Sequence, residues 1–382
     1  MSAPKHGRSR GLFVGRLFGI EFYLDFSWFF IAALVTYTLA VEVFPLEVPD
    51  RSPSFYFLLG AVAAALFFLS ILLHELGHSI VSQRCGIAVP RITLLFIGGL
   101  AEISREPDDA KSELKIALGG PVVSLLLAGL YGGAAILLEK LRIAGFDVVC
   151  TWLSRTNLAL IIFNMFPGYP LDGGRVLRAL LWARSGRMRR ATYITSRIGI
   201  GFSWLLIALG VFLLVRFHQW NAIVLVIIGI FLKTAAERGY DHAIQREVLR
   251  GLSVSDLMTR TPISIPEHLP LSRAVDEFFL TNHHVAFPVC SFEGEFRGLL
   301  RLATIKDVPR EKWPYTTAGD AVADGGASSL SIDVTRTAAR AMRDLLSPGR
   351  GRLAVLDAGK VIGIVTLRDV MQFVEIHTEL EE

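Results

Sequence analysis

Long apolar stretches, separated by short polar segments, fill the first two thirds of the chain. A bilayer core about 30 Å thick needs roughly 20 apolar residues in a spanning helix, and six stretches come near or exceed that length. They predict membrane-spanning helices at residues 24–44, 55–82, 112–137, 149–166, 195–216 and 220–236. The fourth stretch runs into Pro167 and Pro170, which stop a regular helix. Irregular backbone at that depth must border protein or water instead of lipid.

The pattern changes at about Gly251, where prolines and charges become frequent and apolar runs shorten to the length of strands. We therefore expect a polytopic α-helical membrane domain of about six transmembrane helices over residues 1–250, followed by an α/β region. Within that region two segments repeat, GLLRLATIKDV at 298–308 and GKVIGIVTLRDV at 359–370. In each, a β-rich run leads to Thr-x-x-Asp, and a short helix and strand are predicted upstream. The repeat predicts two similar domains, over residues 251–312 and 313–382.

Composition agrees with a membrane location. Apolar residues make up 52% of the chain and charged residues 19%, which is too apolar for ordinary soluble domains. Lys and Arg gather before the first stretch and between the fourth and fifth, whereas the intervening outer loops carry few. By the positive-inside rule these basic segments face the cytosol. With an even number of spans, we expect a multi-pass protein of the cell (plasma) membrane whose N- and C-termini are both cytoplasmic.

The second stretch contains the segment LLHELGHSIV, residues 72–81, with three ionisable side chains inside an otherwise apolar helix. Positions four apart share one helix face, so His74 and His78 can offer imidazole nitrogens to one ion, with Glu75 beside them. This is the H-E-x-x-H pattern of zinc hydrolases. The alternative is a pair of helix histidines bonded to neighbouring spans. Ionisable groups within a membrane helix are rare and usually functional, which favours the metal site.

A catalytic zinc needs a third protein ligand and an open position for water. Asp172 is the candidate because it is the only carboxylate between Asp147 and Glu237. The Gly173-Gly174 pair after it allows the backbone to come close to a partner. Alternatively, Asp172 caps the helix that follows, and both roles can hold together.

Four motifs in this order, HELGH, FIGGLAEI, GGPVVS and NMFPGYPLDGG, resemble the site-2 protease family of intramembrane zinc metalloproteases over residues 12–236. The resemblance implies one zinc ion per chain, held by His74, His78 and Asp172, with Glu75 as the catalytic glutamate. It also implies that Asn164 orients the substrate or stabilises the oxyanion. For Asn164 the alternative is a buried amide that bonds to a neighbouring helix.

One position departs from the family pattern. Many members carry Asn where Ser124 stands in GGPVVS, so a substrate contact is not carried over to Ser124. The residues themselves favour a different role, in which Gly120 and Ser124 form a small-xxx-small face for close helix packing.

The reaction implied is hydrolysis of a peptide bond in or near the transmembrane segment of a membrane protein substrate. Glu75 would accept a proton from water as the water attacks the peptide carbonyl. A helical substrate must unwind before it is cut. Residues 92–103, ITLLFIGGLAEI, predict a re-entrant hairpin whose free edge could bind the unwound substrate as an added strand. The alternative is a plain structural loop at the membrane surface.

The repeats resemble a tandem pair of CBS (cystathionine-β-synthase) domains over residues 254–376. This resemblance implies an adenine nucleotide as a further ligand, with contacts from Thr304, Asp307, Thr366 and Asp369. Pro309, soon after the first Asp, weakens the first half of that match. Other CBS pairs serve only in docking or dimerisation, so a homodimer through the pair is also predicted.

The expected partners are a membrane protein substrate, such as a membrane-anchored regulatory protein, and the lipid bilayer, without direct nucleic acid. Two alternative functions are compatible with these sequence patterns. A CBS-gated membrane transporter or channel would also use proline-broken spans and intramembrane acids. The metal site could instead be structural, although three obvious ligands favour a catalytic one.

Overall fold

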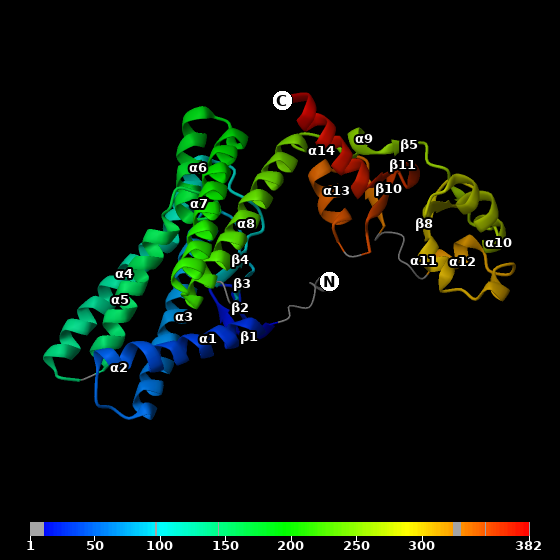
Figure 1. The fold of residues 1–382 in the computed structure, drawn as a ribbon. Helices are drawn as coiled ribbons and strands as arrows, with labels where there is room; N and C mark the ends of the chain where they lie inside the picture. Colours follow the sequence, from blue (N-terminus) through cyan, green and yellow to red (C-terminus); the bar gives the residue numbers. More distant parts are fainter. Residues whose placement is uncertain (1–10, 96–97, 144, 324–329, 348, 382) are drawn as a thin grey trace. The chain divides into compact units, whose positions relative to one another are not determined.

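The computed structural model of the protein describes residues 11–95, 98–143, 145–323, 330–347 and 349–381. The chain divides into two compact units, Met1–Asp241 and His242–Glu382 (Figure 1). The expected fold class is confirmed, with long apolar helices in the first unit and two mixed sheets in the second.

The first unit is built on long helices that begin close to the predicted positions. Its helices are α1 (Phe26–Thr38), the π-helix η1 (Leu39–Val43), α2 (Phe44–Glu47), α3 (Pro53–Arg84), α4 (Ala110–Lys140), α5 (Phe146–Asn164), α6 (Asp172–Ser185), α7 (Met188–Phe217), the 3-10 helix η2 (Trp220–Ala222) and most of α8 (Ile223–Val248), whose last residues belong to the second unit. Within the described residues, five segments are long and apolar enough to cross a membrane, namely Phe26–Glu47, α3, α4, α5 and α7.

The sixth predicted stretch, 220–236, does form a helix, but it falls outside this group of five. The apolar part of α8 is interrupted at Lys233, and Glu237 and Arg238 follow soon after. The predicted starts of the first and fifth spans also shift. The strand Ile20–Asp25 directly precedes α1, and α7 begins at Met188 and so includes part of the basic segment.

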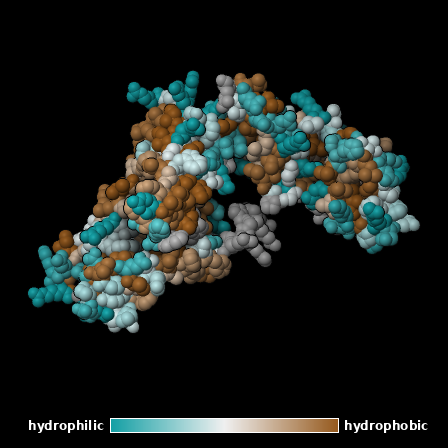
Figure 2. Space-filling model, viewed as in Figure 1, coloured by the Kyte–Doolittle hydropathy of each residue, from teal (hydrophilic) through white to brown (hydrophobic). Residues whose placement is uncertain are grey.

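Large apolar side chains on these helices are exposed to the surroundings of the protein. Leu126 and Leu130 on α4 are 68% and 65% exposed, and Leu205 and Val215 on α7 are 63% and 73% exposed. Figure 2 shows apolar residues gathered over the helices of the first unit on the face in view. Such a surface is expected where helices face hydrocarbon.

A four-stranded sheet completes the first unit. Its strands are β1 (Gly11–Leu17), β2 (Ile20–Asp25), β3 (Arg91–Leu95) and β4 (Gly98–Glu102), and they pair in that order. β2 and β3 are parallel, whereas β1–β2 and β3–β4 are antiparallel. The hairpin predicted at 92–103 is therefore confirmed as β3–β4, although residues 96–97 lie outside the described residues. β1 and β4 form the two edges, and the β1–β2 hairpin was not predicted.

The second unit contains two small sheets, each with its own apolar core. The elements of its first half are α9 (Val254–Leu257), β5 (Thr259–Arg260), β6 (Ile265–Pro266), α10 (Leu271–Ala274), the π-helix η3 (Val275–Leu280), β7 (Ala286–Cys290), β8 (Phe296–Arg301), α11 (Leu302–Lys306) and the 3-10 helix η4 (Arg310–Lys312). Those of its second half are α12 (Ala318–Ala323), β9 (Ser331–Asp333), α13 (Ala338–Leu345), β10 (Arg352–Asp357), β11 (Lys360–Thr366) and α14 (Leu367–Glu381).

The two halves exchange their opening helices. Val254 and Leu257 of α9 are buried in the core of the sheet β5-β11-β10-β9. Ala318 and Val322 of α12 are buried in the core of the sheet β6-β7-β8. Each sheet therefore depends on a helix that precedes the other half in the sequence. The predicted limits 251–312 and 313–382 therefore mark the two sequence repeats, but they do not separate the two apolar cores.

Candidate metal centre

Three side chains from two helices converge inside the first unit. The Nε2 atoms of His74 and His78 lie 3.2 Å apart. Each Nε2 also lies 3.2 Å from a different carboxylate oxygen of Asp172, Oδ2 for His74 and Oδ1 for His78. The side chains are buried, with exposures of 3%, 7% and 9% in the order His74, His78, Asp172.

The separation of the three residues fits a zinc ion. A tetrahedral zinc with bonds of about 2.0 Å places its ligand atoms about 3.3 Å apart, close to the three separations observed. Among the described residues this is the only group of three or more His, Cys, Asp or Glu side chains arranged to hold a metal. Asp172 does not cap α6, because Leu171 occupies the N-cap position and no side-chain cap is formed there. The capping alternative is therefore wrong.

The second nitrogen of each histidine is bonded to α4. Nδ1 of His78 lies 2.7 Å from the carbonyl oxygen of Ile116, which can only accept, so a bond here requires the hydrogen on Nδ1 and leaves Nε2 of the neutral ring with its lone pair. Nδ1 of His74 lies 2.8 Å from the hydroxyl of Ser124. The backbone N–H of Gly120, on the same helix, approaches the same Nδ1 of His78 at 3.3 Å, which is longer than the contact with Ile116.

Glycines allow the helices around the three candidate ligands to pack closely together. The backbones of α3 and α4 approach at Gly77 and Gly119, and a Cβ at Gly120 would overlap the Nε2 atoms of both histidines. On α6, a Cβ at Gly173 would meet the carbonyl of Met165, as the glycine pair predicted. The close-packing role predicted for Gly120 is therefore confirmed. Ser124 has an additional role that the sequence did not show, since it bonds to a candidate ligand.

Glu75 is placed between the metal centre and the sheet. It follows His74 on α3 and is half-buried. A Cβ at Gly99 of β4 would overlap Cγ of Glu75, so the backbone of this edge strand lies directly on the glutamate. Asn164 is the half-buried last residue of α5. Among the described residues, no hydrogen bond joins it to the three candidate ligands.

A buried ion pair ties α4 to α6 next to the site. Glu113 is fully buried, and Arg178 is 3% exposed. Nε of Arg178 donates to Oε1 of Glu113 at 3.1 Å, and Arg175 approaches the same oxygen at 3.5 Å. This pair was not predicted, because Glu113 stands in a segment with several other acids and the sequence does not show which of them is buried.

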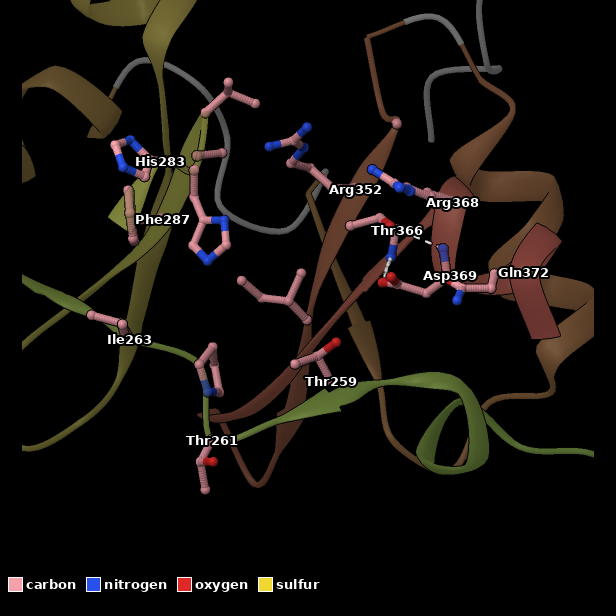
Figure 3. A pocket seen from close by; sticks show the side chains of 16 residues that line it. Thr259, Thr261, Ile263, His283, Phe287, Arg352, Thr366, Arg368, Asp369 and Gln372 are labelled. Atoms are coloured by element: carbon pink, nitrogen blue, oxygen red, sulfur yellow. Dashed lines mark hydrogen bonds between the residues drawn. The ribbon is translucent and has the colours of Figure 1, made fainter. Parts of the chain in front are cut away.

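The second unit contains a cavity of about 720 Å³ that both of its halves line. His283 and Phe287 come from the first half, whereas Arg352, Thr366 and Asp369 come from the second (Figure 3). Thr366 and Asp369 form reciprocal bonds at the start of α14, from Thr366 N to Oδ2 (2.9 Å) and from Asp369 N to Oγ1 (3.2 Å).

The other predicted pair lies elsewhere. Thr304 is in the short helix α11, Asp307 follows it, and neither lines this cavity. The cavity lining also includes Arg352 and Arg368, neither of which was predicted as a ligand contact. Two guanidinium groups and the N-terminus of α14 make the cavity suitable for an anion.

Comparison with known proteins gives matches along nearly the whole chain. The family model described as Peptidase family M50 matches residues 62–143 and 132–206, and the CBS domain model matches residues 254–311 and 328–376. A protein of Mycobacterium tuberculosis named as a zinc metalloprotease, Rip3, is 32% identical over 95% of this chain and 93% of its own. The Synechocystis protein sll0528, likewise named as a zinc metalloprotease, is 30% identical over 94% of each chain.

A solved structure, the Site-2 Protease from Methanocaldococcus jannaschii, is 27% identical and covers 60% of this chain and 95% of its own, with a TM-score of 0.41. The relatives that span the membrane part are named as metalloproteases, so the transporter or channel alternative is not supported.

Proposed function

Because the chain belongs to peptidase family M50, the site-2 proteases, and is an intramembrane zinc metalloprotease with a CBS pair, we propose that His74, His78 and Asp172 hold its zinc ion and that Glu75 is the general base. The observation that carries this proposal is the convergence of the three side chains: the two histidine Nε2 atoms lie 3.2 Å apart, and each lies 3.2 Å from one carboxylate oxygen of Asp172. A bound zinc ion supplies an acidified water and polarises a carbonyl. The carboxylate of Glu75, adjacent on the same helix, accepts the proton of the attacking water.

The substrate is a membrane protein, and we propose that its unwound segment pairs with the free edge of β4. Two observations support this placement. β4 is an edge strand, so among the residues that the structure describes no strand pairs with its outer backbone groups. Its Gly99 also lies against Glu75, which brings a peptide paired at this edge near the base. Asn164 is proposed to orient the same segment or to stabilise the oxyanion from the end of α5.

The chain is a multi-pass membrane protein, and the plasma membrane with both termini in the cytoplasm is the proposed arrangement. The basic residues before α1 and around α6 support it. It requires α8 to provide a sixth crossing, with Lys233 reaching toward the interface. A membrane-anchored regulatory protein cut near the cytosolic end of its span would suit this orientation.

Two variants test the catalytic assignment in purified full-length protein. Glu75→Gln should retain zinc and abolish cleavage of a membrane substrate, because the neutral amide cannot accept the proton. Asp172→Ala should lose most of its zinc, because one of three ligands is removed. Retained turnover in the first variant, or full zinc content in the second, would remove that residue from its role. Comparing membrane proteomes of cells with wild-type and Glu75→Gln protein would reveal accumulated, uncut substrates.

We propose further that the cavity of the second unit binds an adenine nucleotide through the Thr366–Asp369 half. Its volume, its two arginines and the N-terminus of α14 support a phosphate-bearing ligand. Thr304 and Asp307 lie outside this cavity, so the proposal no longer includes them. Titration calorimetry with AMP, ADP and ATP should detect binding to the full-length protein and to Asp307→Ala, but not to Asp369→Ala. Equal binding by all three proteins, or by none, would contradict the assignment. Dimerisation through the CBS pair is a separate proposal, which analytical ultracentrifugation can examine.

A further inference from the structure

The proposed zinc ligand His74 is hydrogen-bonded, through its Nδ1 atom, to a serine of another helix. Ser124 lies on α4, and its hydroxyl oxygen is 2.8 Å from Nδ1 of His74. The residue has no solvent-exposed surface. It bonds to the side of the imidazole ring opposite the nitrogen that faces His78 and Asp172.

The chemistry of the hydroxyl decides which way this hydrogen bond runs. A serine hydroxyl can donate or accept, unlike the carbonyl of Ile116 that faces His78. If Nε2 of His74 is to bind a metal, its Nδ1 must carry the hydrogen and Ser124 must accept it. Replacing Ser124 with Ala would leave the Nδ1–H of the metal-binding tautomer buried without an acceptor.

We infer that Ser124 is a positioning residue that orients His74 for zinc and does not contact the substrate. This inference rests on the proposed zinc site. A substrate that approaches the Nε2 side of His74 meets the two histidines and Asp172. Ser124 lies on the Nδ1 side of the ring, away from this approach. The small side chain also fits the narrow space between α3 and α4, where Gly77 and Gly119 approach each other.

The test measures zinc affinity in full-length protein, with zinc alone as the probe and a chelator of known affinity as competitor. Ser124→Ala should bind zinc about 10- to 100-fold more weakly than the wild type, as expected when the partner of a metal-bound histidine is removed. The matched control is Ser203→Ala. Ser203 is equally buried but donates to the carbonyl of Gly199 on its own helix, at 2.7 Å. This control should keep the wild-type affinity.

The possible outcomes separate the two claims. If wild-type protein binds no zinc, the proposed site itself fails. If wild type binds zinc and Ser124→Ala binds it equally well, only the role of Ser124 is overturned. Circular dichroism checks that both serine variants retain their helices. A weakening seen equally in Ser203→Ala would show a general packing effect and would also contradict the inference.

Discussion

Single residues of the metal centre differ in how far the sequence could predict them. His74 and His78 are four positions apart on one helix, so local periodicity already places them together. Asp172 could be predicted because it is the only acid in a long apolar region. Ser124 and Gly99 could not be assigned their contacts, because both come from segments that approach α3 only in the folded chain.

Gly99 provides a prediction at this scale. Gly99→Ala should lower the rate of substrate cleavage by about 10- to 100-fold, because the added Cβ displaces Glu75 and a shift near 1 Å is costly in a catalytic site. Zinc content should stay at the wild-type level, since the three ligands are not touched. Cleavage of a membrane substrate in detergent and metal analysis of the same samples measure both effects. Gly15→Ala is the control, because a Cβ there meets no atom within 4 Å in the same sheet. Unchanged cleavage in Gly99→Ala would show that β4 can move away from Glu75.

The helices of the first unit were predictable as elements because apolar length alone identifies them. The β1–β2 hairpin was missed for two physical reasons. β1 reads GLFVGRL and lacks the alternation of a half-buried strand, since its apolar side chains are exposed on both faces. Its two-residue turn uses Phe18 and Gly19, both with positive φ. Because Phe18 takes the first turn position, the turn lacks the Asn-Gly or Asp-Gly pair by which such turns are usually predicted.

The pair between α4 and α6 gives a prediction at the scale of elements. Glu113→Gln should destabilise the protein by about 3–5 kcal/mol, because Arg178 would remain buried without its counter-charge. Thermal unfolding in detergent should show the loss as a lower midpoint, and zinc content should fall because Asp172 begins α6.

Glu139→Gln on an exposed position of α4 is the matched control and should leave the midpoint unchanged. A Glu113→Leu, Arg178→Met double variant should recover stability. If it is as unstable as Glu113→Gln, the pair contributes more than charge neutralisation.

The division of the whole molecule into a membrane unit and a second, mixed unit follows from composition, which changes near the predicted boundary. The internal arrangement of the second unit cannot be predicted from composition. The predicted opening helices have similar local patterns, and only tertiary packing decides which sheet buries each of them. Repeats in a sequence therefore identify two similar halves without showing that the halves have exchanged an element.

This exchange predicts that the second unit folds as a whole and not by halves. Residues 242–382 contain both sheets with all the helices of their cores, so this fragment should unfold in one cooperative transition. A fragment of residues 242–312 lacks Ala318 and Val322, which fill the core of its own sheet, and leaves Val254 and Leu257 of α9 without the sheet that buries them. It should show no cooperative transition and should expose apolar surface. Scanning calorimetry, with comparison of the calorimetric and van't Hoff enthalpies, measures the difference.

Extending the short fragment to residue 323 restores the helix of the first sheet and should recover part of the transition. A sharp transition in the 242–312 fragment would mean that the exchanged helices are dispensable, and the two repeats would then be independent domains.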